Sequence, residues 1–510
     1  MSSGDDKRPG LGRRELLTGL GAAAVASALP TRAALTTRDI NRWDLTTDVL
    51  VAGSGAAGLS AALAARAEGA SVLVLEVLPR FGGSSGMSGG VVYAGGGTAL
   101  QKSLGVKDSP EEMYAFIVGA GSPHAQLDKI EQYCIDSVAH FDWLVEMGVP
   151  YSNKFTAAKG LPMGDESLYF SGNEQAWPAR EIATPIPRGH VPGVVGMTGG
   201  RTLMAALLAR ARAAGIGMQS RSAGERLILE RDGSVAGMRV DMNGESRNIR
   251  ARHGVVLASG GFIHNREMLT RYAPELANCS VPWGNAGDRG DGIVMGMAAG
   301  GATLRMHHGF AIVPVYPPEH VLSGIIVNAQ GQRFVAEDSY HGVLGHNVAY
   351  HQGGKAWLIT DEQSSFGFHQ DNFVQVARAN TIGDLAVAAG FPQSALQHTV
   401  AYYNRFAASG RDPLFHKSQQ YLRPVQGPPY RAWNLSVDKA FFPAHTFGGL
   451  QTTVDGEVVN AFGEAIAGLY AVGRTSAGLP MAPYIASGLS VGDCTYFGRL
   501  AGRHAGGMAA

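Results

Sequence analysis

The chain has 510 residues, of which 45% are hydrophobic and 16% charged, enough to bury a large core in up to about three domain-sized units. Its 42 basic and 42 acidic residues leave no net charge and form no basic stripe, which argues against nucleic acid as a partner. Cys134, Cys279 and Cys494 form neither a CxxC motif nor metal-ligand spacing, so we expect buried thiols, no disulfide framework and no metal site.

Residues 1–35 have the pattern of an export signal. The pair Arg13-Arg14 precedes an apolar stretch from Leu16 to Leu29, which is too short to span a bilayer, and small residues follow it. We interpret the segment as a twin-arginine-type signal, which predicts a periplasmic or otherwise exported protein. The alternative is a disordered basic tail on a cytoplasmic protein. No other stretch has the pattern of a transmembrane helix.

A βαβ unit follows the signal. The sequence predicts a strand at 48–52, a helix at 59–69 and a second strand at 71–76. Gly53-x-Gly55-x-x-Gly58 lies between the first strand and the helix, and Glu76 ends the second strand. Such glycines allow a tight turn and the close approach of a pyrophosphate, the helix N-terminus attracts phosphate, and the acid can accept hydrogen bonds from a ribose. The unit therefore predicts a dinucleotide site.

Further elements with the same character follow at a distance. A helix is predicted from about Thr202, strands at 253–262 and 469–476, and a final helix at 488–505. Residues 287–442 are richer in aromatics, histidine and proline. We predict an α/β fold in which a discontinuous Rossmann-like nucleotide-binding domain, at 44–286 and 443–510, holds an inserted α+β catalytic domain at 287–442.

Several stretches resemble the flavoprotein family that includes fumarate reductases and 3-ketosteroid dehydrogenases. "FGGSS" at 81–85, "VVLASGGF" at 255–262 and "GLYAVG" at 468–473 are similar to its FAD-binding half, while 287–300 and 324–340 are similar to its inserted catalytic (capping) domain. The resemblance covers about residues 45–507 and implies non-covalently bound FAD. With the turn and the acid above, the predicted FAD-binding residues are Gly53, Ser54, Gly55, Ala57, Gly58, Glu76, Gly83, Ser84, Ser85, Ser88, Gly89, Gly90, Ala258, Gly260, Asp291, His445, Gly473, Ser487, Ser490 and Val491.

Two tyrosines distinguish the branches of this family. Fumarate reductases clamp a dicarboxylate with arginines at the positions that Tyr340 and Tyr484 occupy here, whereas the ketosteroid dehydrogenase branch has tyrosines at both. The resemblance implies that the Tyr484 hydroxyl and the Gly488 N–H bind a ketone oxygen as an oxyanion hole. It also implies that Tyr340 removes the α-proton while FAD N5 takes the hydride from the neighbouring carbon.

A tyrosine base needs a lowered pKa, because a free phenol has a pKa near ~10. We expect a neighbour such as His341 or Tyr169 to lower the pKa of Tyr340, and we count Tyr169 and Ser487 among the candidate catalytic residues. The expected function is desaturation of a small hydrophobic cyclic ketone, similar to a 3-ketosteroid, with the 4-dehydrogenases of 5α-reduced substrates resembling this chain more than the 1-dehydrogenases. The electron acceptor stays open. Alternatives are a reductase of an activated alkene, a desaturase of smaller cyclohexanone-type ketones, and a catalytically inactive flavoprotein.

Overall fold

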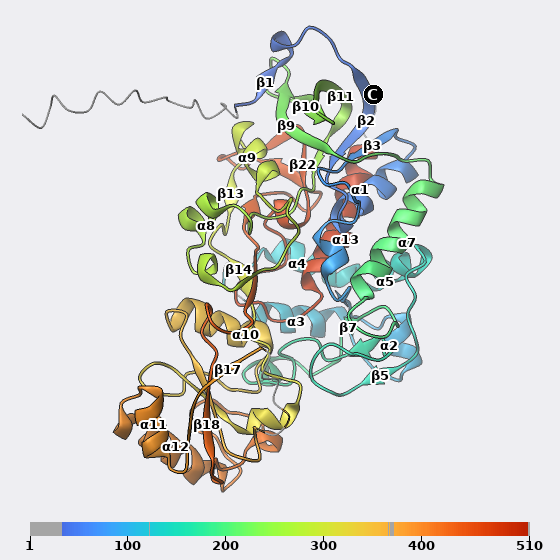
Figure 1. Cartoon of the computed structure of the whole chain (residues 1–510). Helices are drawn as coiled ribbons and strands as arrows, with labels where there is room; N and C mark the ends of the chain where they lie inside the picture. Colours follow the sequence, from blue (N-terminus) through green and yellow to red (C-terminus); the bar gives the residue numbers. More distant parts are fainter. Residues whose placement is uncertain (1–32, 122, 366, 368–371, 508–510) are drawn as a thin grey trace, which may run out of the picture. The chain divides into compact units, whose positions relative to one another are not determined.

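The computed structural model describes residues 33–507 except 122, 366 and 368–371 (Figure 1). The predicted export signal lies outside this part of the chain, apart from its last three residues. Within the described residues, no helix combines the length and the apolar character that a membrane crossing requires.

A nine-stranded sheet forms the nucleotide-binding part of the fold. The strands run in the order β1-β9-β10-β11-β2-β3-β8, and β22, which pairs with β21, joins β11. Five of them, in the order β8-β3-β2-β11-β22, are parallel. The strands are β1 (Leu35–Thr36), β2 (Leu45–Ala52), β3 (Val72–Leu75), β8 (Gly217–Gln219), β9 (Ser222–Leu229), β10 (Val235–Met242), β11 (Glu245–Leu257), β21 (Glu457–Val459) and β22 (Ala465–Ala471).

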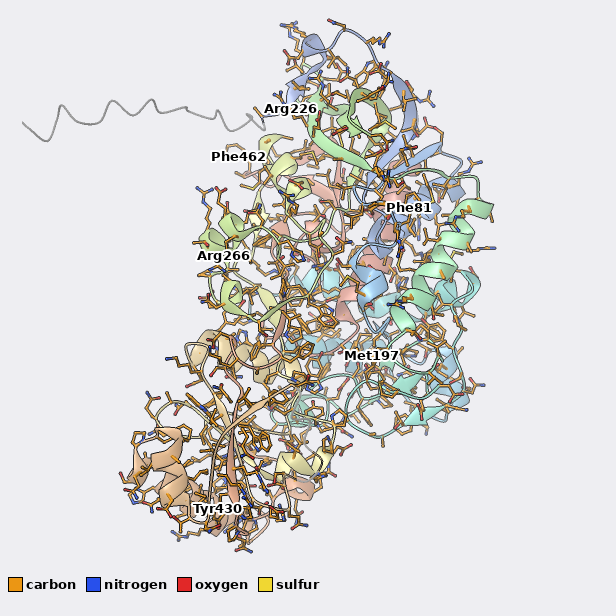
Figure 2. All side chains as sticks on the ribbon, viewed as in Figure 1. Phe81, Met197, Arg226, Arg266, Tyr430 and Phe462 are labelled. Carbon is orange, nitrogen blue, oxygen red and sulfur yellow. The ribbon has the colours of Figure 1, made fainter. Side chains whose placement is uncertain are left out.

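The sheet confirms the predicted α/β fold and its discontinuity. Strand β22, from the C-terminal part of the chain, pairs in parallel with β11, with Val255 opposite Leu469. Gly254 marks a register shift between β11 and β2 and has a φ of +136°, and a Cβ there would lie 2.6 Å from the carbonyl oxygen of Gly468. Glycine is therefore what lets β11 bend and accept β22 as a neighbour. Phe462, in the turn between β21 and β22, is exposed (Figure 2).

Two helices pack closely beside this sheet through small residues. Helix α1 (Ala56–Ala67) follows β2, and α13 (Leu489–Gly506) ends the described chain. Gly498, Gly502 and Gly506 recur every fourth residue on α13, so they share one face. A Cβ at Gly502 would lie 2.1 Å from the carbonyl oxygen of Ala61 on α1, so the two backbones touch.

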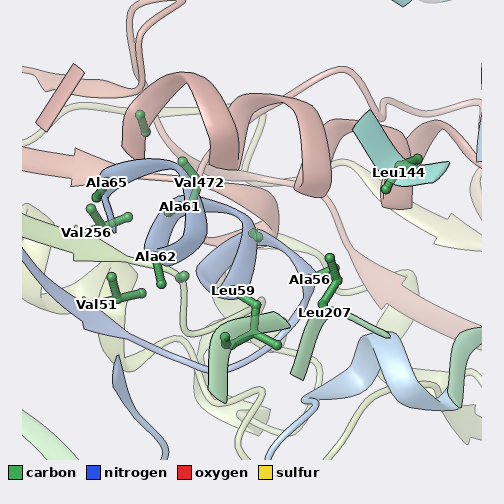
Figure 3. Packing of buried hydrophobic residues seen from close by; sticks show 14 of the residues in the cluster. Val51, Ala56, Leu59, Ala61, Ala62, Ala65, Leu144, Leu207, Val256 and Val472 are labelled. Carbon is green, nitrogen blue, oxygen red and sulfur yellow. The ribbon is translucent and has the colours of Figure 1, made fainter. Parts of the chain in front are cut away.

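The hydrophobic core of this part surrounds α1. Figure 3 shows Leu59 of α1 near Leu207 of α7 (Gly199–Ala213), and Ala62 near Val51 of β2. All four side chains are fully buried. This core fixes the start of α1, and with it the glycine turn, against the carboxyl ends of the parallel strands.

A second, antiparallel sheet lies entirely within residues 325–434, inside the predicted catalytic insertion. Its order is β15-β16-β18-β17, with α11 and α12 packed on one face. Successive residues face opposite sides: Ile325 and Val327 belong to the core beneath these helices, and Ile326 belongs to the core on the other face. The elements are β15 (Ile325–Val327), β16 (Trp357–Thr360), β17 (Val374–Ala379), β18 (Tyr430–Asn434), α11 (Ile382–Ala389) and α12 (Gln393–Ala407).

There are three further small sheets among the described residues, of which β12-β19-β14 and β13-β20 connect these parts. The order β12-β19-β14 joins strands from before, after and within 287–442, so this sheet crosses both predicted domain boundaries, which stay a prediction. The short strands are β4 (Val92–Tyr93), β5 (Phe155–Thr156), β6 (Leu168–Tyr169), β7 (Gly189–His190), β12 (Val281–Pro282), β13 (Thr303–Leu304), β14 (Gly309–Ala311), β19 (Pro443–Thr446) and β20 (Gly449–Leu450). The remaining α-helices are α2 (Ala99–Ser103), α3 (Pro110–Ala120), α4 (Leu127–Ile135), α5 (Ser137–Glu146), α6 (Ala179–Ile182), α8 (Arg266–Tyr272), α9 (Asp291–Ala298) and α10 (His341–His346).

Candidate functional site

The glycine turn between β2 and α1 is as tight as the motif predicts. Gly53 has a φ of +118°, and a Cβ there would lie 2.2 Å from the carbonyl oxygen of Ala258. A Cβ at Gly58 would lie 1.9 Å from the carbonyl oxygen of Gly53. Gly55 is the N-cap of α1, whose first-turn N–H groups have no acceptor within the helix, and that of Ala56 donates to the Ser85 hydroxyl at 3.1 Å. The turn therefore offers backbone donors and the positive end of a helix dipole to an anion.

The start of α1 opens onto a cavity. Predicted FAD-binding residues that line it come from the glycine turn and the start of α1, from the end of β3, from the turn that follows Phe81, from the ends of β11 and β22 and from the start of α9. They are Gly53, Ser54, Gly55, Ala57, Glu76, Gly83, Ser84, Ser85, Ala258, Gly260, Asp291 and Gly473.

Glu76 is buried in the wall of this cavity. Its Oε2 accepts the Ser54 hydroxyl at 2.5 Å and the Ser54 N–H at 3.2 Å, and its Oε1 accepts the N–H of Leu78 at 2.9 Å. These bonds fix the carboxylate at the end of β3, where a ribose of a bound dinucleotide would meet it.

Other predicted FAD-binding residues do not line this cavity, among the residues that the structure describes. Gly89 and Gly90 pack against the start of α7, where a Cβ at Gly90 would lie 2.3 Å from the carbonyl carbon of Gly199. The Ser88 hydroxyl donates to the carbonyl of Ser85 at 2.8 Å. Gly58 lies inside α1, Ser490 and Val491 lie in the first turn of α13, and His445 and Ser487 lie near the tyrosines described below.

The cavity wall also contains an ion pair that was not predicted from the sequence. Arg474 donates to Asp288 at 2.6 Å, and the same carboxylate oxygen accepts the Ser84 hydroxyl at 2.8 Å. Asn285 donates its N–H to that hydroxyl at 3.0 Å. In the sequence, Asp288 follows Gly287 in "GDRGDG" and Arg474 follows Gly473 in "GRTS", two stretches that resemble the family. The glycine turn, the helix start, the buried acid and this cation together fit the diphosphate and ribose of a dinucleotide.

A second group of predicted residues is assembled by three separate segments. Ser171 accepts the N–H of Ser487 at its carbonyl and donates its hydroxyl to the carbonyl of Ser487, both at 2.9 Å. Asn173 donates its N–H to the carbonyl of Ile485 at 2.8 Å. The side chain of Asn173 accepts the N–H of Tyr340 at 2.9 Å. Residues 169–173, the start of α10 and the segment before α13 therefore meet.

These contacts gather the predicted catalytic hydroxyls. The hydroxyl oxygen of Tyr340 lies 2.6 Å from Oγ of Ser487. The ring centroids of Tyr340 and Tyr484 are 6.2 Å apart, and both side chains are buried. Tyr169 is also buried. It ends β6, and the segment that follows β6 pairs with Ser487.

The Tyr484 hydroxyl lies at the N-terminus of α13. It accepts the N–H of Ser490 at 3.0 Å. Gly488, the N-cap of this helix, has a φ of +103°, and a Cβ there would lie 2.5 Å from the backbone nitrogen of Tyr93. Glycine thus allows the turn that brings the helix start under the phenol.

Aromatic side chains enclose the Tyr484 ring. Phe310 and Phe447 lie 5.2 and 5.1 Å from it between ring centroids. His445 stacks on Phe310 at 4.6 Å. Burial, together with the cation of Arg474, holds the pKa of His445 well below its usual range, so the imidazole is neutral. The surroundings of the phenols suit an apolar, uncharged molecule better than a dianion.

The tyrosines stay protonated at neutral pH. Burial raises the pKa of Tyr484 to about 12, opposed by the Ser490 side chain and backbone and by the Gly488 backbone. Burial raises the pKa of Tyr340 well above that of a free phenol, and the nearby Tyr484 and Tyr169 add to this, while Ser487 opposes it. Burial, with Glu174 next, also raises the pKa of Tyr169.

The expected lowering of the Tyr340 pKa is therefore not met. Tyr169 acts in the opposite direction, and His341 stacks on Tyr316 at 3.9 Å, where burial lowers its own pKa to about 3. A neutral imidazole supplies no positive charge to stabilise a phenolate.

The chain is similar in sequence to known FAD-binding proteins and steroid dehydrogenases. Residues 48–485 match the family model described as an FAD binding domain. The chain is 30% identical over 503 residues to a 3-oxo-5-alpha-steroid 4-dehydrogenase of Comamonas testosteroni, covering 85% of this chain and 93% of that protein. It is 28% identical over 560 residues to a 3-oxosteroid 1-dehydrogenase of Mycobacterium tuberculosis, covering 90% of this chain and 98% of that protein.

A solved structure is similar along almost the whole chain. It is the 3-ketosteroid-Δ4-(5α)-dehydrogenase of Rhodococcus jostii RHA1 in complex with 4-androstene-3,17-dione. The TM-score is 0.87 at 38% identity, with 93% of this chain and 99% of that chain covered.

Proposed function

Because this chain belongs to the FAD binding domain family and is an FAD-dependent oxidoreductase related to dehydrogenases that act on CH–CH groups, we propose that it desaturates a cyclic ketone. The proposed substrate is a 3-ketosteroid, and the new C=C bond lies α,β to the carbonyl. The observation that carries the proposal is the partly buried Tyr340–Ser487 hydroxyl pair beside Tyr484, whose hydroxyl is held at the start of α13.

The cofactor would be held by the cavity described above. The first turn of α1 and Arg474 would face the diphosphate, and Glu76 a ribose. Bound FAD supplies the acceptor for a hydride and for its two electrons.

Tyr484 would bind and polarise the ketone oxygen. Its hydroxyl accepts one helix N–H and keeps its own proton for donation to the substrate. The phenol would then stabilise the negative charge that develops on the ketone oxygen, because its own oxygen accepts an N–H at the positive end of the α13 dipole. Gly488 places the start of α13 and would offer its own N–H to the same oxygen.

The Tyr340–Ser487 pair would take the proton from the α-carbon. The two hydroxyls are 2.6 Å apart, so as one takes the proton from carbon the pair can release another of its protons to solvent water, and no preformed phenolate is needed. This account fits two tyrosines whose pKa values are raised, because it needs no phenolate at rest.

The similarity to 4-dehydrogenases of 5α-reduced 3-ketosteroids supports a double bond between carbons 4 and 5 of the steroid. At 38% and 30% identity, two such enzymes resemble this chain along most of its length. The aromatic surroundings of Tyr484, formed by Phe310 and Phe447, suit the apolar rings of such a substrate.

The test compares the wild-type chain with Tyr484→Phe. We expect the wild type to reduce an artificial electron acceptor when given a 5α-reduced 3-ketosteroid, and the variant to lose about a hundred- to a thousandfold in kcat while retaining FAD. Tyr402→Phe is the control, because Tyr402 is 40% exposed on α12 and should leave kcat unchanged. Equal rates in all three proteins would refute the role of Tyr484. Oxidation of the reduced flavin by an unsaturated ketone without the forward reaction would favour a reductase.

We also propose that the protein is exported after it has folded around FAD. The twin-arginine-type pattern of residues 1–35 supports this. Cell fractionation should find the full-length protein outside the cytoplasm, and replacement of Arg13 and Arg14 by lysine should retain it inside. Equal distribution of the two forms would contradict export by this route.

A further inference from the structure

His308 is a buried histidine that bonds to the segment carrying Tyr484. Its Nδ1 accepts the N–H of Ala482, two residues before Tyr484, at 3.2 Å. Pro483 lies between them and has no N–H, so Ala482 offers the last backbone donor before Tyr484. His308 therefore fixes the backbone immediately before this tyrosine.

The same residue holds the aromatic side chains that enclose Tyr484. The carbonyl of His308 accepts the N–H of Phe447 at 3.0 Å. Phe310 follows His308 by two residues, in the middle of β14. Phe310 and Phe447 are the rings that pack on Tyr484. One residue thus connects the phenol and both rings beside it, which come from three separate segments of the chain.

The bond to Ala482 defines the protonation state of the His308 imidazole. Only an unprotonated Nδ1 can accept an N–H, so the ring is neutral and carries its proton on Nε2. Burial lowers the pKa of His308 to about 3. Neighbouring basic groups add to this effect: His307, Arg305, His124 and His346. The acceptor is therefore retained throughout the neutral and mildly acidic range.

Arg305 begins the turn that presents His308. The N–H of His308 donates to the carbonyl of Arg305 at 2.8 Å. Arg305 has a φ of +51°, an uncommon conformation for a residue with a side chain, which persists where the surroundings impose it. Its guanidinium donates to the carbonyl of Gly478. The turn at 305–308 therefore binds the segment before Tyr484 at two places.

We propose that His308 is a positioning residue for the ketone-binding phenol, an inference that rests on the proposed function. The neutral imidazole keeps the backbone before Tyr484 in a fixed relation to Phe310 and Phe447. The Tyr484 hydroxyl and the two rings then meet the same substrate, the hydroxyl at the ketone oxygen and the rings at its apolar body. Displacement of the hydroxyl weakens the stabilisation of charge on the ketone oxygen and slows the reaction. His308 acts through Tyr484 and transfers no proton itself.

Two substitutions at position 308 test this role. His308→Asn keeps an acceptor near the place of Nδ1 but leaves part of the ring volume empty, whereas His308→Leu fills the volume and has no acceptor. We expect a kcat close to that of the wild type for His308→Asn and one about a hundredfold lower for His308→Leu, with bound FAD in both. If the residue only filled space, the ranking would be reversed. His307→Leu is the matched control, because His307 is exposed and its bond to Tyr350 uses its backbone carbonyl.

The protonation state can be measured independently of activity. Nitrogen NMR of the holoenzyme labelled in its histidines should show one imidazole signal, absent from His308→Asn, whose Nδ1 stays unprotonated between about pH 5 and 8. A proton on Nδ1 of His308 anywhere in this range would overturn the inference, because the Ala482 N–H would then face a donor.

The outcomes separate this inference from the proposed function. A wild type that leaves every 3-ketosteroid unchanged overturns the proposed function and the positioning role with it. A wild type that desaturates the ketone, with a His308→Leu variant at least as fast as His308→Asn, overturns the positioning role alone. If His308→Leu does not fold, His308→Asn decides: a kcat close to that of the wild type supports the role, and a hundredfold loss contradicts it.

Discussion

Tyr340 and Ser487 are 147 residues apart in the sequence, and their side-chain oxygens lie 2.6 Å apart. The hydrogen bond connects the start of α10 with the segment before α13, so it joins the predicted catalytic insertion to the nucleotide-binding part. Residues 171–173 hold both sides in place through Asn173 and Ser171.

If this pair acts as one base, its two members should not contribute independently. Tyr340→Phe and Ser487→Ala should each lower kcat by about a hundredfold or more, and the double variant should be no slower than the worse single one. Steady-state kinetics on the wild type, the two single variants and the double variant measures how far the two effects on kcat depend on each other. Effects that multiply would show that the two hydroxyls act separately.

The glycine turn should decide FAD binding. A Cβ at Gly58 would lie 1.9 Å from a backbone oxygen, so Gly58→Ala must displace the turn or the start of α1. We expect purified Gly58→Ala to contain little FAD by absorbance. Gly427→Ala is the control, because a Cβ there would meet the Asp361 carboxylate at 3.8 Å, an ordinary van der Waals distance. Full FAD content in Gly58→Ala would refute the role given to this turn.

The contact between α1 and α13 should be sensitive to any added side chain. Gly502→Val places atoms where the carbonyl oxygen of Ala61 already lies, and we expect a free energy of unfolding lower by about 3 kcal/mol. Gly383→Ala on α11 should have little effect, because its Cβ would meet only the flexible amide ends of glutamines. Denaturant titration measures both, and a stable Gly502→Val would mean that the helices can separate at no cost.

Asp493 should make stability depend on pH. Burial raises its pKa from 3.8 to about 6, opposed by the Leu479 N–H, Lys129 and Arg305. The folded chain therefore binds this proton more tightly than the unfolded chain. The resulting stabilisation is complete below about pH 4 and is lost as pH rises through about 6.

Asp493→Asn should abolish this dependence. Between pH 4 and 6 the free energy of unfolding of the wild type should fall relative to that of the variant, and above about pH 7 their difference should stay constant. Urea titrations across this range measure the difference, and parallel curves would show that Asp493 does not titrate as described.

Local patterns predicted the nucleotide-binding part well. Gly53, Gly55 and Gly58 act within one turn, and β2, α1 and β3 follow from apolar periodicity, so all of this is visible in about thirty residues of sequence. The confirmed family resemblance supplied FAD, the tyrosine positions and the small-residue strand ends that no periodicity identifies.

Contacts between distant segments could not be predicted in the same way. Asp288 and Arg474 pair in the wall of the dinucleotide cavity, and the charged residues that follow glycines in their two stretches do not reveal that they meet. The raised pKa of Tyr340 depends on burial, which only the packed structure determines. Both Asp288 and Arg474 directly follow a glycine of a stretch that resembles the family, and this position was their one local signal.

Product identification tests the central claim most directly. The purified holoenzyme is incubated with a 5α-reduced 3-ketosteroid and an artificial electron acceptor, and the products are analysed by mass spectrometry and NMR. The account predicts a product lighter by two hydrogens, with the new double bond α,β to the carbonyl, and its near absence with Tyr484→Phe. Unchanged ketone with a fully loaded, folded wild-type enzyme, across a panel of steroid and smaller cyclic ketones, would contradict it.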